Sequence, residues 1–204
     1  MNPSPQQLRR DARGVSEDQR PLRTKRRLVA SLSEVLAGGV EASVASVSAG
    51  AGVGRSTFYT HFTSLEDLVD FAIGLLFSDL APIDHERRSA RSLSRLEISR
   101  MGLNELLDAL LGNQLLVAFA ANSPASERLR THLVEAMATS LQSAILVERP
   151  GASETFVTIT SRYIAAGVIA VVIEALEEPR RFTRDELVAA LLEALPSWLT
   201  GVRG

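Results

Sequence analysis

The chain has 204 residues, no cysteine, 46% hydrophobic residues and a formal net charge of −2. This length allows one or two domains with hydrophobic cores, and a chain without cysteine has no disulfide bond and no thiolate metal site. The charge is unevenly distributed: residues 1–62 hold nine Lys and Arg against five Asp and Glu, whereas residues 63–204 hold thirteen against nineteen. A basic N-terminal part on an acidic body indicates a nucleic-acid partner; a solvated basic tail is the alternative.

Residues 1–20 show no hydrophobic periodicity and predict a flexible arm. The arginines of this arm could contact DNA phosphates or could serve as a solubilising tail. Because no apolar stretch follows the first residues, we expect no signal peptide. The most apolar run, Tyr163–Ile173, is shorter than the about 20 residues of a membrane-spanning helix. The sequence therefore predicts a cytoplasmic protein without membrane contact.

Residues 22–37 predict the first clear helix, because Leu28, Leu32, Val35 and Leu36 recur on one helical face. Gly38-Gly39 follows as a typical helix end. We expect the leucine face to pack on Val44, Val47 and Phe58 and so to complete a three-helix unit over residues 21–63.

Residues 43–62 read SVASVSAGAGVGRSTFYTHF and predict two short helices joined by a glycine-containing turn. Small apolar residues line one face of the first helix, and Phe58 and Phe62 form the inner face of the second. A helix, a short turn and a second helix with a polar outer face are typical of a helix-turn-helix that reads DNA. The candidate DNA contacts on this outer face are Arg55, Ser56, Thr57, Tyr59, Thr60 and His61.

The residues Thr57-Phe58-Tyr59-x-His61-Phe62, preceded by Val47-Ser48-x-x-Ala51-Gly52-Val53, resemble the signature of the TetR/AcrR family of transcriptional regulators. The resemblance implies an all-α homodimer that binds double-stranded DNA at a palindromic operator and responds to a small molecule. It also implies phosphate contacts at the start of the first helix, here Thr24 and Lys25. The family usually has a lysine where this chain has Leu65, so one phosphate contact is missing.

Ser64-x-x-Asp67 predicts the start of a helix that runs from Leu65 to about Leu80 and is ended by Pro82. The family resemblance makes this helix the link between the DNA-binding unit and the effector domain. Residues 83–100 are rich in arginine and weakly periodic, which favours a mobile, solvated connection. A lid or an additional DNA contact is the alternative.

Residues 102–121 predict one strongly apolar helix, and Ser123-Pro124 predicts the start of another that runs to about Val147. Asn113 shares a face with Leu110 and Val117, so its amide needs a partner, either a ligand or a nearby main-chain group. His132 and Glu135 lie three residues apart without a third metal ligand, and we expect no metal and no cofactor. The candidate effector contacts are Leu110, Asn113, Val117, Phe119, Met137 and Tyr163.

The last two predicted helices, from Phe156 to Leu176 and from Thr183 onward, have the pattern of an oligomerisation element. The first is apolar around its circumference from Tyr163 on, and Ala166, Gly167 and Ala170 allow close approach of a partner. Pro196 is expected to kink or end the second. Residues 64–204 are thus predicted to bind a ligand and to dimerise.

The predicted fold is all-α, with a helix-turn-helix unit followed by an effector-binding and dimerisation domain, and the predicted function is that of a ligand-responsive repressor. No nucleophile–base pair or acidic cluster indicates an enzyme. Two alternatives remain: a DNA-binding dimer without a small-molecule effector, which is protein-responsive or an activator, and a small-molecule binding protein whose head no longer reads DNA. We expect an apolar or amphipathic effector, because leucine, valine and alanine dominate the body.

Overall fold

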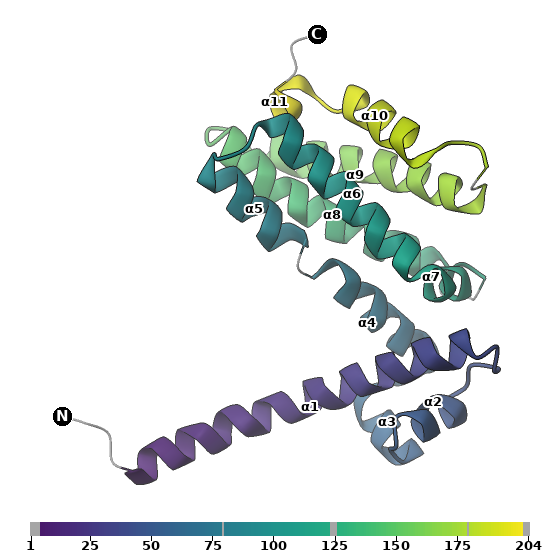
Figure 1. Cartoon of the computed structure of the whole chain (residues 1–204). Helices are drawn as coiled ribbons and strands as arrows, with labels where there is room; N and C mark the ends of the chain where they lie inside the picture. Colours follow the sequence, from purple (N-terminus) through teal and green to yellow (C-terminus); the bar gives the residue numbers. More distant parts are fainter. Residues whose placement is uncertain (1–4, 79, 123–125, 179, 202–204) are drawn as a thin grey trace. The chain divides into compact units, whose positions relative to one another are not determined.

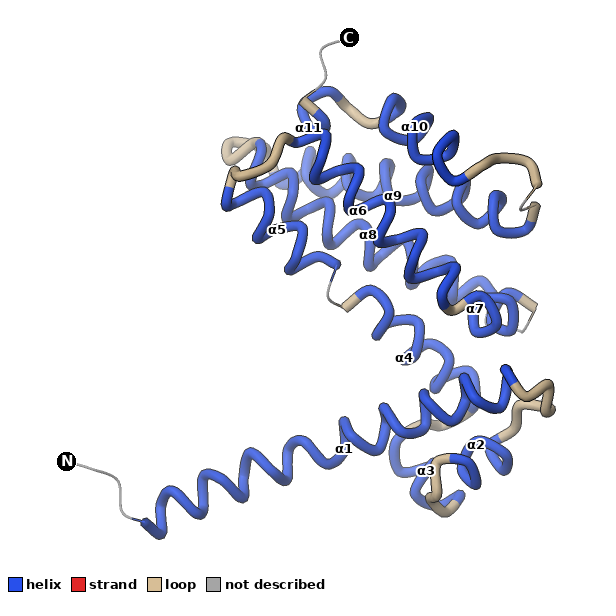
Figure 2. The backbone as a smooth tube through the Cα atoms, viewed as in Figure 1, coloured by secondary structure: helices blue, strands red, loops and turns tan. Residues whose placement is uncertain are grey.

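A computed structural model describes residues 5–78, 80–122, 126–178 and 180–201, with side chains from Arg20 onward. Over these residues the chain forms eleven helices and no strand (Figures 1 and 2). The all-α prediction is therefore confirmed. The helices form two compact units, residues 1–72 and residues 73–204, which we call unit 1 and unit 2. The division falls inside a helix: unit 2 begins at residue 73, nine residues beyond the predicted start of the second domain at residue 64.

Helix α1 runs from Pro5 to Ala37, so the prediction of a flexible arm over residues 1–20 is corrected for residues 5–20. The missing apolar periodicity misled the prediction, because periodicity reports packing against a core and not helicity itself. Gln, Leu, Arg and Glu have good intrinsic helix propensity, and extending an existing helix is much easier than starting one. Residues 1–4 of the predicted arm lie outside the described residues.

Unit 1 packs α1 against α2 (Val44–Gly50) and α3 (Arg55–His61), with the first part of α4 (Leu65–Phe77) beside them. Ser43 caps α2: its hydroxyl accepts from the Ser46 amide, and the Ser46 side chain accepts from the Ser43 amide. The expected leucine face of α1 is buried in this core, whose largest fully buried side chains are Leu28, Leu32, Val47, Phe58 and Leu68.

Unit 2 continues with α5 (Leu80–Ala90), where the sequence predicted a helix end at Pro82 and a solvated segment after it. Pro82 is instead the third residue of α5, where its missing N–H loses no hydrogen bond because the first N–H groups of a helix have no intrahelical partner. The arginine-rich segment is also largely helical, since α6 (Arg95–Gly112) begins after a capping box at Ser94. Arg88 in particular is buried, so a solvated loop is the wrong description.

The predicted single helix over residues 102–121 is divided at Asn113 into α6 and α7 (Gln114–Ala121). Asn113 has φ −124° and ψ 29°, and its side-chain amide donates to the carbonyl of Ala109 at 2.9 Å. An asparagine that bonds its own main chain competes with helix propagation. Helix α8 (Ser126–Glu148) follows, and the predicted start at Ser123-Pro124 lies outside the described residues.

The C-terminal part consists of α9 (Glu154–Glu177), α10 (Arg184–Ala194) and the short α11 (Ser197–Thr200). Ser153 caps α9, and Thr183 forms the predicted capping box with Glu186. Pro196 separates α10 from α11, as predicted. Helix α9 packs against α8, which in turn packs against α5, so α8 lies at the centre of unit 2 (Figure 1).

Helix α9 is long and apolar enough to cross a membrane by length and composition, with a mean hydropathy of 1.9 in an 18-residue window. The apolar run Tyr163–Ile173 considered in the sequence covers only part of this helix. The same values are found for core helices of soluble proteins. In this chain 39% of the window is buried, with Val157, Ile164 and Val168 on the buried side.

Candidate functional site

The helix-turn-helix of unit 1 is positioned by contacts from α1. The Arg27 guanidinium donates to the carbonyl of Ala51 at 2.5 Å, and the Ser31 hydroxyl donates to the carbonyl of Val47 at 2.8 Å. The first bond satisfies the carbonyl of Ala51 at the end of α2, where helix carbonyls lack intrahelical partners; the second is added to the bond that the Val47 carbonyl already accepts from the Ala51 amide. Gly52 then turns the chain with φ +63°, a conformation that glycine adopts without steric cost. Sequence reasoning gave no role to Arg27 or Ser31, because the contact joins segments 16 and 24 residues apart.

Helix α3 has one buried and one exposed face. Phe58 is fully buried and contacts the rings of Tyr59 and Phe62. The opposite face presents hydroxyl, imidazole and guanidinium groups over two helical turns, and Tyr59 is 59% exposed. The predicted DNA contacts Arg55, Ser56, Tyr59 and Thr60 are exposed, and Thr57 and His61 are half-buried. A short helix with this polar face has the chemistry needed to read base edges and phosphates in a major groove.

The two predicted contacts on α1 are placed differently. The Lys25 ammonium lies over the rings of Phe62 and Phe71, at 5.5 and 5.0 Å from their centroids, within the range of a cation–π interaction. The Thr24 hydroxyl donates to the carbonyl of Arg20 within the same helix. Arg23 and Arg26, three residues apart, are exposed. Lys25 therefore has an aromatic partner inside unit 1, whereas Arg23 and Arg26 present exposed positive charges on α1.

Unit 2 contains a partly open cavity of about 80 Å³ between α5, α6, α8 and the C-terminal helices. Of the predicted effector contacts, only Met137 lines it. Leu110 and Val117 line a second, equally open pocket of about 810 Å³, between the end of α6, α7, the start of α8 and the end of α9. Asn113 and Phe119 line neither space in the described part of the chain, and Tyr163 is 79% exposed on α9. The structure therefore does not bring the predicted effector contacts together.

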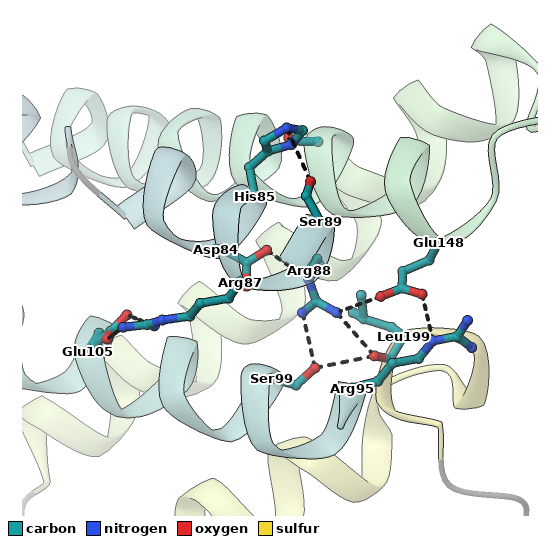
Figure 3. Close-up of polar contacts among 11 residues, drawn as sticks. Asp84, His85, Arg87, Arg88, Ser89, Arg95, Ser99, Glu105, Glu148 and Leu199 are labelled. Atoms are coloured by element: carbon teal, nitrogen blue, oxygen red, sulfur yellow. Dashed lines mark hydrogen bonds and ion pairs between the residues drawn. The ribbon is translucent and has the colours of Figure 1, made fainter. Parts of the chain in front are cut away.

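One side of the cavity carries a chain of alternating charges (Figure 3). Arg88 donates through Nε to Asp84 at 2.8 Å, and its Nη1 lies 3.4 Å from Glu148. The second oxygen of Glu148 lies 2.5 Å from Nε of Arg95. Arg88 also donates to the hydroxyl of Ser99 and to the carbonyl of Leu199. A buried guanidinium with this many partners ties α5 to α6, α8 and α11.

A second, half-exposed pair lies beside this chain. Arg87 and Glu105 form two parallel hydrogen bonds of 2.9 and 2.7 Å. The hydrogen bonds that Arg87 donates to the Glu105 carboxylate raise the pKa of Arg87 above its usual value. Sequence reasoning missed both arginine sites, because neither the burial of Arg88 nor its partners 60 and 111 residues away leave a local pattern.

Comparison with known proteins supports the fold through solved structures alone. No protein-family model and no curated protein matches the chain. Solved structures do match: a putative TetR family transcription regulator from Shewanella sp. PV-4 aligns with a TM-score of 0.54 and 18% identity, over 88% of this chain and 99% of that one. The chain has the fold of the TetR-type regulators.

Two further solved structures of regulators agree with this assignment. The dihydroxyacetone kinase operon activator DhaS aligns with a TM-score of 0.59 and 18% identity, over 84% of this chain and 94% of that chain. The transcriptional regulator FadR from Bacillus subtilis, solved with stearoyl-CoA, aligns with 0.54 and 16%, over 87% and 98%. At these identities the similarity establishes the TetR-type fold, and the function is argued from the site.

Proposed function

We propose that this chain is a DNA-binding regulator of transcription that acts as a homodimer, most simply a ligand-responsive repressor that blocks access to a promoter. The observation that carries the proposal is the exposed polar face of α3, opposite the buried Phe58, in a helix-turn-helix whose α2 end is bonded to Arg27 and Ser31. The solved structures with this fold are regulators by name, and DhaS is named an activator. The fold therefore leaves the sign of regulation to experiment. We place the protein in the cytoplasm with its DNA and assign it no enzymatic activity.

The homodimer is supported by an exposed apolar stripe on α9. Ile159 is 63% and Tyr163 79% exposed, and the small residues Ala166, Gly167 and Ala170 continue the stripe. No side chain lies within 4 Å of a Cβ built on Gly167, so a partner helix has room to approach. A helix that is apolar on its outer face needs a cover, and two-fold pairing would place two α3 helices on one palindromic operator.

DNA binding is tested by fluorescence anisotropy on DNA flanking the gene of this protein, against scrambled DNA, at several salt concentrations. We expect preference for the flanking DNA, and we expect Arg55→Ala to weaken binding about tenfold, because a guanidinium on a base edge or phosphate is lost. Arg100→Ala, which removes an exposed arginine of unit 2, is the matched control. Equal binding of both variants, or no preference across genomic fragments, would refute the proposal.

Dimerisation is tested by sedimentation velocity. Gly167→Glu places a charge on the α9 stripe and should yield monomers, whereas Gly112→Glu places the same charge on an exposed glycine of α6 and should leave the dimer intact. A dimer that survives Gly167→Glu would exclude the stripe as the interface.

The small volume of the cavity beside Arg88 favours a second candidate function, that of a DNA-binding dimer without a small-molecule effector. Ligand pockets usually measure about 300–1,000 Å³; this cavity measures about 80 Å³, and only the pocket beside Leu110, at about 810 Å³, falls within that range among the described residues. The ligand experiment described next distinguishes the two candidates.

A further inference from the structure

The walls of the partly open cavity beside Arg88 combine an apolar side with charged groups. Leucines and Met137 from α6 and α8 form the apolar side, and Asp84, Arg88 and Glu105 contribute the charges. Each of these charges already has an opposite partner: Asp84 with Arg88, Arg88 also with Glu148, and Glu105 with Arg87. Arg95 then balances Glu148. The charged groups around the cavity thus sum to zero.

A neutral set of charges disfavours a charged ligand of either sign. A bound anion would lie against Asp84 and Glu105, and a bound cation would lie beside the buried Arg88. Either ion would lose part of its hydration without gaining an unpaired counter-charge, which is unfavourable. Separating Arg88 from Asp84 to free a counter-charge would in turn leave a buried group unpaired.

Two polar groups on the cavity wall nevertheless have hydrogen-bonding capacity left. Asp84 accepts from Arg88 through Oδ2, and its Oδ1 has no hydrogen-bond partner among the described residues. A Cβ added at Gly102 of α6 would lie 3.9 Å from this oxygen, so Gly102 itself leaves space beside it. The Ser140 hydroxyl on α8 also lines the cavity. An acceptor and a hydroxyl in an otherwise apolar space suit a ligand with one hydrogen-bond donor.

We propose that this cavity binds a small uncharged molecule with an apolar body and a hydroxyl or amide donor, which donates to Asp84 Oδ1, and that this molecule is the effector. Only the effector role of the ligand rests on the proposed function; ligand binding at this site does not require that the protein binds DNA. A volume of about 80 Å³ limits the ligand to a few non-hydrogen atoms, and such small ligands bind in the millimolar range.

The chain contains a suitable reporter, because Trp198 is its single tryptophan. Trp198 lies on α11 next to Leu199, which lines the cavity, and its ring packs 6.3 Å from that of Phe156. The full chain is titrated with 1-butanol, butanoate and butylammonium, three ligands of the same length and different charge. We expect a saturable change of Trp198 fluorescence with 1-butanol, and binding of both ions at least about tenfold weaker.

Two glycine variants show whether the signal comes from the cavity. Gly102→Leu fills the space against Asp84, and Gly112→Leu adds the same side chain at the exposed end of the same helix. Leu has better helix propensity than Gly, and thermal melts verify that both variants fold. We expect Gly102→Leu to abolish the 1-butanol signal and Gly112→Leu to retain it. Binding of either ion as tight as that of 1-butanol, or an unchanged signal in Gly102→Leu, overturns the site.

DNA anisotropy with and without 1-butanol tests the effector role. We expect saturating 1-butanol to change the DNA affinity of the wild type at least about threefold and that of Gly102→Leu not at all. An unchanged affinity of the wild type overturns the effector role. If the chain binds 1-butanol in the cavity and no DNA, the proposed function fails and the site stands; if it binds DNA and no 1-butanol, the site fails and the proposed function stands.

Discussion

In unit 1 the polar side chains that enter the interior bond to main-chain carbonyls, whereas in unit 2 they bond to other charged side chains. Arg27 and Ser31 hold the end of α2 through the carbonyls of Ala51 and Val47. Arg88 holds four helices together through Asp84, Glu148 and their neighbours. A main-chain acceptor is present whatever residue occupies the position, so the reading face of α3 can change its side chains without losing its support. The network of unit 2 depends on the identity of each member.

Among substitutions that test this difference between the two units, Arg88→Leu should cause the largest loss of stability. The substitution leaves Asp84 and Glu148 without their buried partner, and breaking a buried ion pair in this way costs about 3–5 kcal/mol of stability. Thermal and urea unfolding measure the loss. Arg87→Leu, which breaks the half-exposed pair with Glu105, should cost about 1 kcal/mol or less. Equal losses in the two variants would show that the buried network does not organise unit 2.

In unit 1 the largest effect is expected at Gly50. A Cβ at this position would lie 2.3 Å from the Ser31 hydroxyl, so Gly50→Ala should displace α2 from α1 and destabilise unit 1 by about 1–3 kcal/mol. The measurement is urea unfolding followed by circular dichroism. Gly74→Ala is the control, since nothing lies within 4 Å of its Cβ, and it should stabilise α4 by about 0.5–1 kcal/mol. Removing the clash with Ser31→Ala should restore part of the loss; a double variant no more stable than Gly50→Ala would contradict the mechanism.

A smaller effect of opposite sign is expected at Ser48, the exception to the pattern of unit 1. Its hydroxyl is buried and has no hydrogen-bond partner in the described part of the structure. Ser48→Ala should therefore stabilise unit 1 by about 1 kcal/mol, visible as a higher urea midpoint. Ser31→Ala is the matched comparison, because it removes a hydroxyl that is bonded, and it should destabilise. A loss of stability in Ser48→Ala would reveal a partner for this hydroxyl.

The smallest effect concerns an exposed pair of unit 2. The hydrogen bond from Arg184 lowers the pKa of Asp108 below its usual value. A lowered pKa means that the contribution of the pair is complete above the pKa of the unfolded chain and is lost as the pH falls through that of the folded chain. An NMR titration should show the midpoint of Asp108 below the ordinary aspartate range and its return toward that range in Arg184→Gln. An unshifted midpoint in the wild type would exclude the pair in solution.

Sequence reasoning succeeded where local chemistry decides the structure. The Gly-containing turn after α2, the inward Phe58 and the capping box at Thr183 each depend on residues a few positions apart, and the structure contains all three. The buried Arg88 depends on partners 60 and 111 residues away, so its segment resembled a solvated loop. The predicted effector contacts line different spaces for a related reason. Leu110 and Met137 are both apolar helix positions, and only the packing of α6, α7 and α8 decides which space each one lines.

For the dimeric regulator proposed above, the apolar stripe of α9 would make activity depend on how much of the protein the cell contains. If a second copy covers the stripe, pairing follows mass action, and the paired fraction rises with total concentration. Below the dissociation constant of the pair, occupancy of the operator then grows with the square of the monomer concentration. A twofold dilution would reduce occupancy about fourfold. Such a chain would release its target gene sharply when its own synthesis falls behind growth.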